Sequence, residues 1–99
     1  MQLQFIKPQE IDAYLAKGAQ FIDLRDRESY NRQHIQGAIS IPYEQFEQSM
    51  LRLSRNKVYV LYCEHGTTSL KALKRMLSKG YQGYTLGGGV ARLFGDGKR

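Results

Sequence analysis

The residues best suited to chemistry are a single cysteine and the six residues that follow it. Cys63 is the only cysteine among the 99 residues, and it precedes the small and polar segment Glu64-His65-Gly66-Thr67-Thr68-Ser69. A loop of small residues that wraps around one atom turns its backbone N–H groups inward, and a glycine allows the backbone angles that this needs. We therefore expect the N–H groups of residues 64–68 to surround the Cys63 sulfur.

The segments on either side of this loop point to the same chemistry. Every residue of 58–62 is apolar or aromatic, which is typical of a central strand covered on both faces in a parallel sheet. An apolar stripe predicts a helix over residues 69–79, which Gly80 ends; the stripe is formed by Leu70, Leu73, Met76 and Leu77. Working sites of open α/β sheets lie where strands end, so Cys63 falls at the expected place.

The start of that helix brings a partial positive charge to the same point. Together with the N–H groups of the loop, this charge favours a thiolate at Cys63 and a role for the thiolate as a nucleophile. The alternative is a buried, unreactive thiol that ends a strand, a common role for free cysteine. The Gly66 loop favours the nucleophile.

The remaining patterns predict one small α/β domain over residues 1–99, with a parallel sheet and helices on both faces. Apolar spacing predicts helices over residues 8–17, after Pro42 and near 90–94. Short strands are expected at 21–24, 39–41 and 84–86, and residues 95–99 read as a frayed tail.

Composition narrows the class of protein further. The chain is 41% hydrophobic and 24% charged, as in ordinary globular domains. Its longest apolar run, residues 58–63, is too short to span a bilayer, and residues 1–8 lack the pattern of a signal peptide. One cysteine cannot form an internal disulfide. We therefore expect a cytoplasmic protein that does not bind a membrane.

The net charge of +6 is unevenly distributed along the chain. Residues 1–50 carry five basic and seven acidic residues, whereas residues 51–99 carry ten and two. A basic half attracts nucleic acid, an acidic partner or a small anion, and charge alone does not choose among them. Because the tyrosines at 59 and 62 lie in the predicted central strand, they are expected in the core rather than on an RNA-binding surface. We expect no nucleic-acid partner.

Several segments in order resemble the rhodanese family over about residues 21–93. The resemblance is carried by the following motifs: Phe21-Ile22-Asp23-Leu24-Arg25, Glu28-Ser29-Tyr30, His34-Ile35-Gln36-Gly37-Ala38-Ile39 through Pro42, the loop Cys63 to Ser69, and Leu86-Gly87-Gly88-Gly89-Val90. The loop resembles the variant with His at its third position that occurs in short bacterial thiosulfate sulfurtransferases.

This resemblance implies a sulfurtransferase that needs no metal or organic cofactor. Cys63 would take a sulfane sulfur from a small anionic donor such as thiosulfate, hold it as a persulfide, and pass it to a thiol, cyanide or a protein acceptor. The substrate-binding residues would be Glu64, His65, Gly66, Thr67, Thr68 and Ser69, and the three hydroxyl side chains among them are expected to donate to sulfur or to a bound oxyanion. The alternative function is a rhodanese-like module that binds a partner protein without turnover.

Four other residues have alternative interpretations. Asp23 and Arg25 either support the active loop, as the resemblance implies, or form only an ion pair. We interpret His34 as a structural residue that fixes a loop by one hydrogen bond. His65 is two residues from Cys63 and is expected at the rim, with a role as a base for the thiol as the alternative. A zinc site built from these histidines and Cys63 would lack the usual fourth ligand.

The loop departs from its relatives in its charge, because many of them carry Arg or Lys there and the only charge here is the acid Glu64. Leu93-Phe94 stands where relatives often have Trp, a change that we expect to be neutral. Related cysteine phosphatases have a loop one residue longer and an Arg six residues after the nucleophile, where this chain has Ser69.

This last difference predicts that the protein does not hydrolyse aryl phosphates. Phosphoryl oxygens need a bidentate clamp, and Ser69 cannot supply one. The measurement is the release of phenol from an aryl phosphate by the wild-type protein and by Cys63→Ser. Turnover that disappears in the variant would contradict this prediction.

Overall fold

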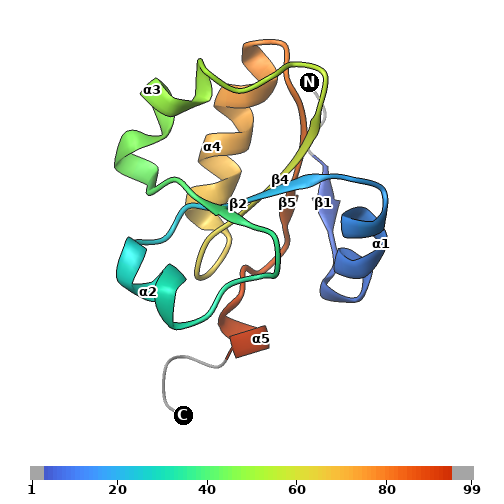
Figure 1. The fold of residues 1–99 in the computed structure, drawn as a ribbon, viewed down its shortest axis with the longest axis vertical. Helices are drawn as coiled ribbons and strands as arrows, with labels where there is room; N and C mark the ends of the chain where they lie inside the picture. The colour runs from blue at the N-terminus through green and yellow to red at the C-terminus, as the bar shows by residue number, and fades with distance from the viewer. Residues whose placement is uncertain (1–3, 95–99) are drawn as a thin grey trace.

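The computed structural model of the protein describes residues 4–94, and these residues form a five-stranded sheet with the order β1-β5-β4-β2-β3 (Figure 1). The strands are β1 (Phe5–Ile6), β2 (Gln20–Asp23), β3 (Ile39–Ser40), β4 (Val58–Tyr62) and β5 (Gln82–Leu86). Every pairing is parallel. The predicted parallel sheet is therefore confirmed, with β4 as its central strand.

Helices cover both faces of this sheet. They are α1 (Ile11–Ala16), α2 (Arg27–Arg32), α3 (Phe46–Met50), α4 (Thr67–Ser78) and α5 (Ala91–Phe94), with short 3₁₀ turns at Pro8–Glu10 and Tyr43–Gln45. Side chains that alternate along β4 point to opposite faces. Leu61 packs in a cluster with the buried residues of α3 and α4, whereas Val60 packs in a cluster that includes side chains of α1 and α5.

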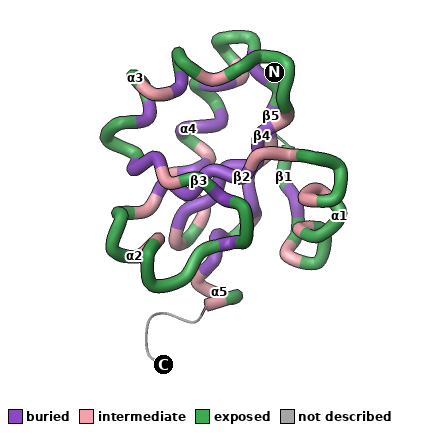
Figure 2. The backbone as a smooth tube through the Cα atoms, viewed as in Figure 1, coloured by how far each residue is buried: buried purple, intermediate pink, exposed green. Residues whose placement is uncertain are grey.

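Most residues of β2 and β4, which run through the centre of the molecule, are buried (Figure 2). Tyr59 and Tyr62 are fully buried, as the sequence predicts. Both hydroxyls are hydrogen-bonded: that of Tyr59 donates to the Ser54 carbonyl at 2.7 Å, and that of Tyr62 accepts from the Ile35 N–H at 3.1 Å. Burial raises the pKa of Tyr62 well above its ordinary value, so this hydroxyl stays neutral.

Two elements were not expected from the sequence. β1 pairs with β5. Its two residues are too few to produce an alternating pattern. Helix α2 has no buried residue; its first turn is held by the Asp26 carboxylate, which accepts a hydrogen bond from the Ser29 N–H at 2.8 Å. Aspartate is a preferred N-cap residue, and Asp26 is the sign by which this helix can be recognised.

Helix α4 begins two residues earlier than predicted. Thr67 and Thr68 therefore lie in its first turn, and the Leu70 N–H donates to the Gly66 carbonyl at 3.2 Å. Leu24, expected in a strand, lies just after β2. The predicted tail at residues 95–99 falls outside the described residues. Within residues 4–94, no helix is long and apolar enough to cross a membrane.

Candidate active site

Cys63 lies directly after β4, at the carboxyl end of the central strand. Its Sγ accepts hydrogen bonds from the backbone N–H of Gly66 at 3.1 Å and from that of Ser69 at 3.2 Å. Only 5% of the residue is exposed. One of the two donors lies outside the segment 64–68 that the sequence indicated, because the chain enters α4 earlier than predicted.

The sulfur takes the place of a helix cap. Gly66 is the N-cap residue of α4 and has φ +99°, which favours glycine, and no side chain at this position caps the helix. The N–H of Ser69, the third residue of the helix, is the group that a capping side chain ordinarily binds. Here it binds Cys63 Sγ instead. The partial positive charge of the twelve-residue helix therefore acts on the sulfur.

The Ser69 hydroxyl has a different role from the one expected. It donates to the Gly66 carbonyl at 3.2 Å and lies 2.6 Å from the Thr85 hydroxyl, with both side chains buried. It is thus engaged with the base of the loop and with β5, rather than with the sulfur. Sequence reasoning missed Thr85, whose signal is a single hydroxyl residue in an otherwise apolar strand end.

Backbone contacts from the segment after β5 hold the other side of the loop. The Val90 N–H donates to the Cys63 carbonyl at 3.0 Å, and the Ala91 N–H donates to the Glu64 carbonyl at 2.9 Å. A Cβ at Gly89 would lie 2.6 Å from the Cys63 carbonyl oxygen and would also overlap the Glu64 carbonyl. The run of glycines after a strand signals such a close approach, although the sequence pattern did not say which backbone is approached.

Arg25 connects the loop to β2. Its guanidinium forms a bidentate pair with Asp23, with Nη2 2.8 Å from Oδ2, and its Nη1 lies 3.7 Å from the Glu64 carboxylate. The same Nη2 donates to the Gln33 carbonyl. Burial alone lowers the pKa of Arg25, but the hydrogen bonds and charge of Asp23 raise it above its ordinary value. The predicted ion pair is present and also reaches the loop.

The two histidines differ in their surroundings. His34 Nδ1 is 2.8 Å from the Tyr30 carbonyl, and its ring stacks on that of Tyr30 with centroids 3.8 Å apart, which agrees with the structural role predicted for it. His65 is exposed in the loop, as is Thr67, whereas Thr68 is half-buried. Within residues 4–94, no three Cys, His, Asp or Glu side chains are grouped closely enough to hold a metal ion.

A family model described as rhodanese-like domain matches residues 7–93. This range includes the Cys63 loop, β5 and the three glycines at 87–89. The chain belongs to the rhodanese-like domain family. The resemblance carried by the sequence motifs is therefore confirmed for nearly all of the described residues.

Curated relatives of this rhodanese-like domain include two named sulfurtransferases. It is 35% identical over 88 residues to a tRNA sulfurtransferase of Pyrobaculum aerophilum, covering 84% of this chain but only 18% of that protein. It is 32% identical over 77 residues to the thiosulfate sulfurtransferase GlpE of Shewanella oneidensis, covering 77% of this chain and 76% of that protein. The chain thus spans about a fifth of the first relative and about three quarters of the second.

Solved structures show the same fold. A rhodanese-related protein from Thermoplasma volcanium superposes with a TM-score of 0.85 at 22% identity, covering 97% of this chain and 95% of that one. A rhodanese homolog from Thermus thermophilus gives a TM-score of 0.74 at 27% identity, covering 88% of this chain and 97% of that one. The size and arrangement of this rhodanese-like domain therefore match those of solved members.

The contact between Gly89 and the loop predicts a difference between two neighbouring glycine variants. Both Gly88 and Gly89 have positive φ, but a Cβ at Gly88 meets no atom within 4 Å. Gly88→Ala therefore bears only the backbone cost, whereas Gly89→Ala also overlaps two carbonyl groups, and it should lower the free energy of unfolding by about 1–3 kcal/mol more. Urea unfolding measures the difference. Equal values for the two variants would show that this backbone approach is not constrained.

Proposed function

We propose that this rhodanese-like domain is a sulfurtransferase that carries sulfane sulfur as a persulfide on Cys63, with thiosulfate or a similar anion as the donor. One observation carries the proposal: Cys63 Sγ accepts two backbone N–H hydrogen bonds at the N-terminus of α4. Such a site stabilises negative charge on sulfur, and the thiolate is the nucleophilic form of cysteine. The names of the relatives support transfer of sulfur as the reaction class.

In the first step, the Cys63 thiolate attacks the outer sulfur of thiosulfate. A new S–S bond forms at Sγ, the S–S bond of thiosulfate breaks, and its electron pair leaves with sulfite. The product is an anionic persulfide, and no electrons are gained or lost overall. The backbone N–H groups that hold the thiolate before the step are fixed by the loop, so they need no reorganisation as the charge moves.

In the second step, a nucleophilic acceptor attacks the outer sulfur of the persulfide. The bond between that sulfur and Sγ breaks, and its electron pair returns to Cys63 as thiolate. Cyanide would leave as thiocyanate, and a thiol or a protein thiolate would leave as a persulfide. All of the bond changes occur at sulfur, so neither a metal nor an organic cofactor is needed.

Arg25 acts in this proposal as a positioning residue. The residue is held by Asp23, whose side chain is 0% exposed, while 9% of the Arg25 side chain and 40% of the Glu64 side chain are exposed. The guanidinium also lies 5.9 Å from the Tyr62 ring and 5.3 Å from the Phe94 ring. These contacts fix Arg25 just beyond β2 and let it orient the first residue of the loop after Cys63.

The charge and cysteine content of the chain fit the same proposal. The excess of basic residues beyond residue 50 attracts an anionic donor from solution. A single free cysteine that must stay reduced suits the cytosol, where thiols are kept reduced. We place the reaction there, with neither nucleic acid nor membrane required for it.

Mass spectrometry of the intact protein tests the proposal directly. After incubation with thiosulfate, the mass should rise by one sulfur atom, and cyanide should remove the added mass, since it accepts the outer sulfur. Cys63→Ser should show neither change. A wild-type protein that stays unmodified with several sulfane donors would instead indicate a rhodanese-like module that binds a partner without turnover.

Glu64 provides a test of how charge at the loop affects the donor. Its carboxylate repels a dianion, and Arg25 at 3.7 Å offsets this only partly because it is already paired with Asp23. Glu64→Gln should therefore lower the KM for thiosulfate about two- to fivefold at low salt. Initial rates with and without added salt measure the effect, which should shrink as salt rises.

A collapse of kcat in Glu64→Gln would contradict this electrostatic role. It would show that the contact with Arg25 is required to hold the loop in shape. Glu47→Gln is a suitable control, because Glu47 is an exposed acid on α3 that pairs with Arg75 rather than with the loop. This control should leave the KM for thiosulfate unchanged.

A further inference from the structure

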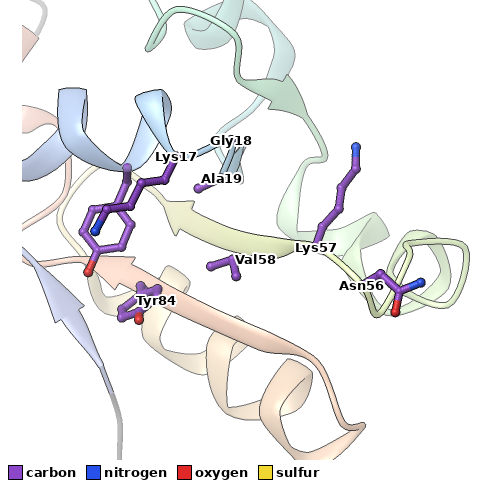
Figure 3. Close-up of a pocket in the computed structure, with 8 residues that line it drawn as sticks. Lys17, Gly18, Ala19, Asn56, Lys57, Val58 and Tyr84 are labelled. Carbon is purple, nitrogen blue, oxygen red and sulfur yellow. The ribbon is translucent and has the colours of Figure 1, made fainter.

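Thr85 carries a buried hydroxyl that the two sulfur-transfer steps do not use. The residue lies on β5 and is fully buried, as is Ser69 on α4. A buried hydroxyl costs free energy unless it is hydrogen-bonded. Tyr84, the preceding residue of β5, lines a cavity at the end of α1 (Figure 3). Because side chains alternate along a strand, Thr85 points to the opposite face of the sheet, towards α4.

The Thr85 hydroxyl is connected to the Cys63 loop through Ser69. Ser69 Oγ lies 2.6 Å from Thr85 Oγ1, and it donates its own proton to the Gly66 carbonyl at 3.2 Å. A hydroxyl has only one proton to donate, so Thr85 is the donor to Ser69. The structure therefore contains a directed chain of hydrogen bonds that runs from Thr85 to Ser69 and on to the Gly66 carbonyl.

This chain of hydrogen bonds links the two residues whose N–H groups bind the sulfur. The Gly66 and Ser69 N–H groups donate to Cys63 Sγ at 3.1 and 3.2 Å. Thr85 pairs in register with Leu61 of β4, two residues before Cys63. The strand that anchors the two donors is thus the direct neighbour of the strand that carries the sulfur, so the hydroxyls fix both N–H groups relative to Cys63.

We propose that Thr85 is a positioning residue for the Cys63 nucleophile. Its hydroxyl holds Ser69 and Gly66 so that both N–H groups stay directed at the sulfur, which increases the reactivity of the thiol. The inference rests on the proposed function, because it concerns the same thiolate. A neutral substitution at Thr85 leaves the charged side chains at the loop in place, so its effect on the thiol arises from geometry rather than from charge.

Thr85→Ala and Thr85→Ser form a matched pair, because they differ only in the hydroxyl. The measurement is the rate constant for alkylation by iodoacetamide at neutral pH, which reports on Cys63 because the chain has one cysteine. Thr85→Ala should lower this rate constant about three- to tenfold, as expected for the loss of one hydrogen bond, whereas Thr85→Ser should stay within about twofold of the wild type.

A double-mutant cycle tests whether Thr85 acts through Ser69. Ser69→Ala keeps the backbone N–H that binds the sulfur but removes the hydroxyl, so it should slow alkylation at least as much as Thr85→Ala does. Adding Thr85→Ala to Ser69→Ala should then lower the rate constant by less than about 1.5-fold. Effects that multiply would show that the two hydroxyls act independently, and they would overturn the proposal.

Tyr59→Phe is the control for a general loss of stability. It removes a hydroxyl that donates to the Ser54 carbonyl, before β4 and at the other end of this strand from Cys63. This variant should leave the alkylation rate constant unchanged. The proposal is wrong if Thr85→Ala is alkylated as fast as the wild type or faster, or if Tyr59→Phe slows alkylation equally.

The same measurements separate this proposal from the proposed function, because alkylation requires no sulfur donor. A wild-type protein that takes no sulfur from any sulfane donor would overturn the proposed sulfur transfer. If alkylation in that case is still slowed by Thr85→Ala and restored by Thr85→Ser, the positioning role of Thr85 stands.

Discussion

The backbone N–H groups of Gly66 and Ser69 point at one sulfur atom, and most of the surrounding structure serves to keep them there. Each N–H needs a partner because it belongs to the start of α4, where no carbonyl of the helix can accept it. The sulfur satisfies this need, so the stability of the helix start and the proposed reactivity of the thiol depend on the same contacts. A substitution that disturbs one therefore disturbs the other.

Segments on both sides of the loop in sequence fix this arrangement from different directions. β4 delivers Cys63 from the centre of the sheet, and the Ser69 hydroxyl joins the first turn of α4 to Thr85 on β5. The Val90 N–H binds the Cys63 carbonyl, and Gly89 lets the two backbones approach. Arg25, just after β2, acts on the loop through Glu64. The loop is thus held mainly by backbone groups, which vary little with side-chain identity.

The sequence predicted the sheet and the position of Cys63 at the end of its central strand because both leave strong local patterns. The limits of β4 follow from its unbroken apolar run, and Cys63 stands out by its uniqueness and its glycine-containing loop. The parts that escaped prediction depend on distant partners. The two residues of β1 become a strand only by pairing with β5. The local sequence around Thr85 and Gly89 does not identify Ser69 or the loop carbonyls as the groups that they contact.

The parallel pairing of β1 with β5 also affects how the chain folds. Phe5 pairs with Thr85, so one edge of the sheet joins nearly opposite ends of the described chain, and contacts of such long range form slowly. During synthesis from the N-terminus, Cys63 emerges before Thr85, Gly89 and Val90, the residues that close its loop. The nascent chain therefore carries an unenclosed thiol, and the environment proposed to make it a nucleophile is completed only late in folding.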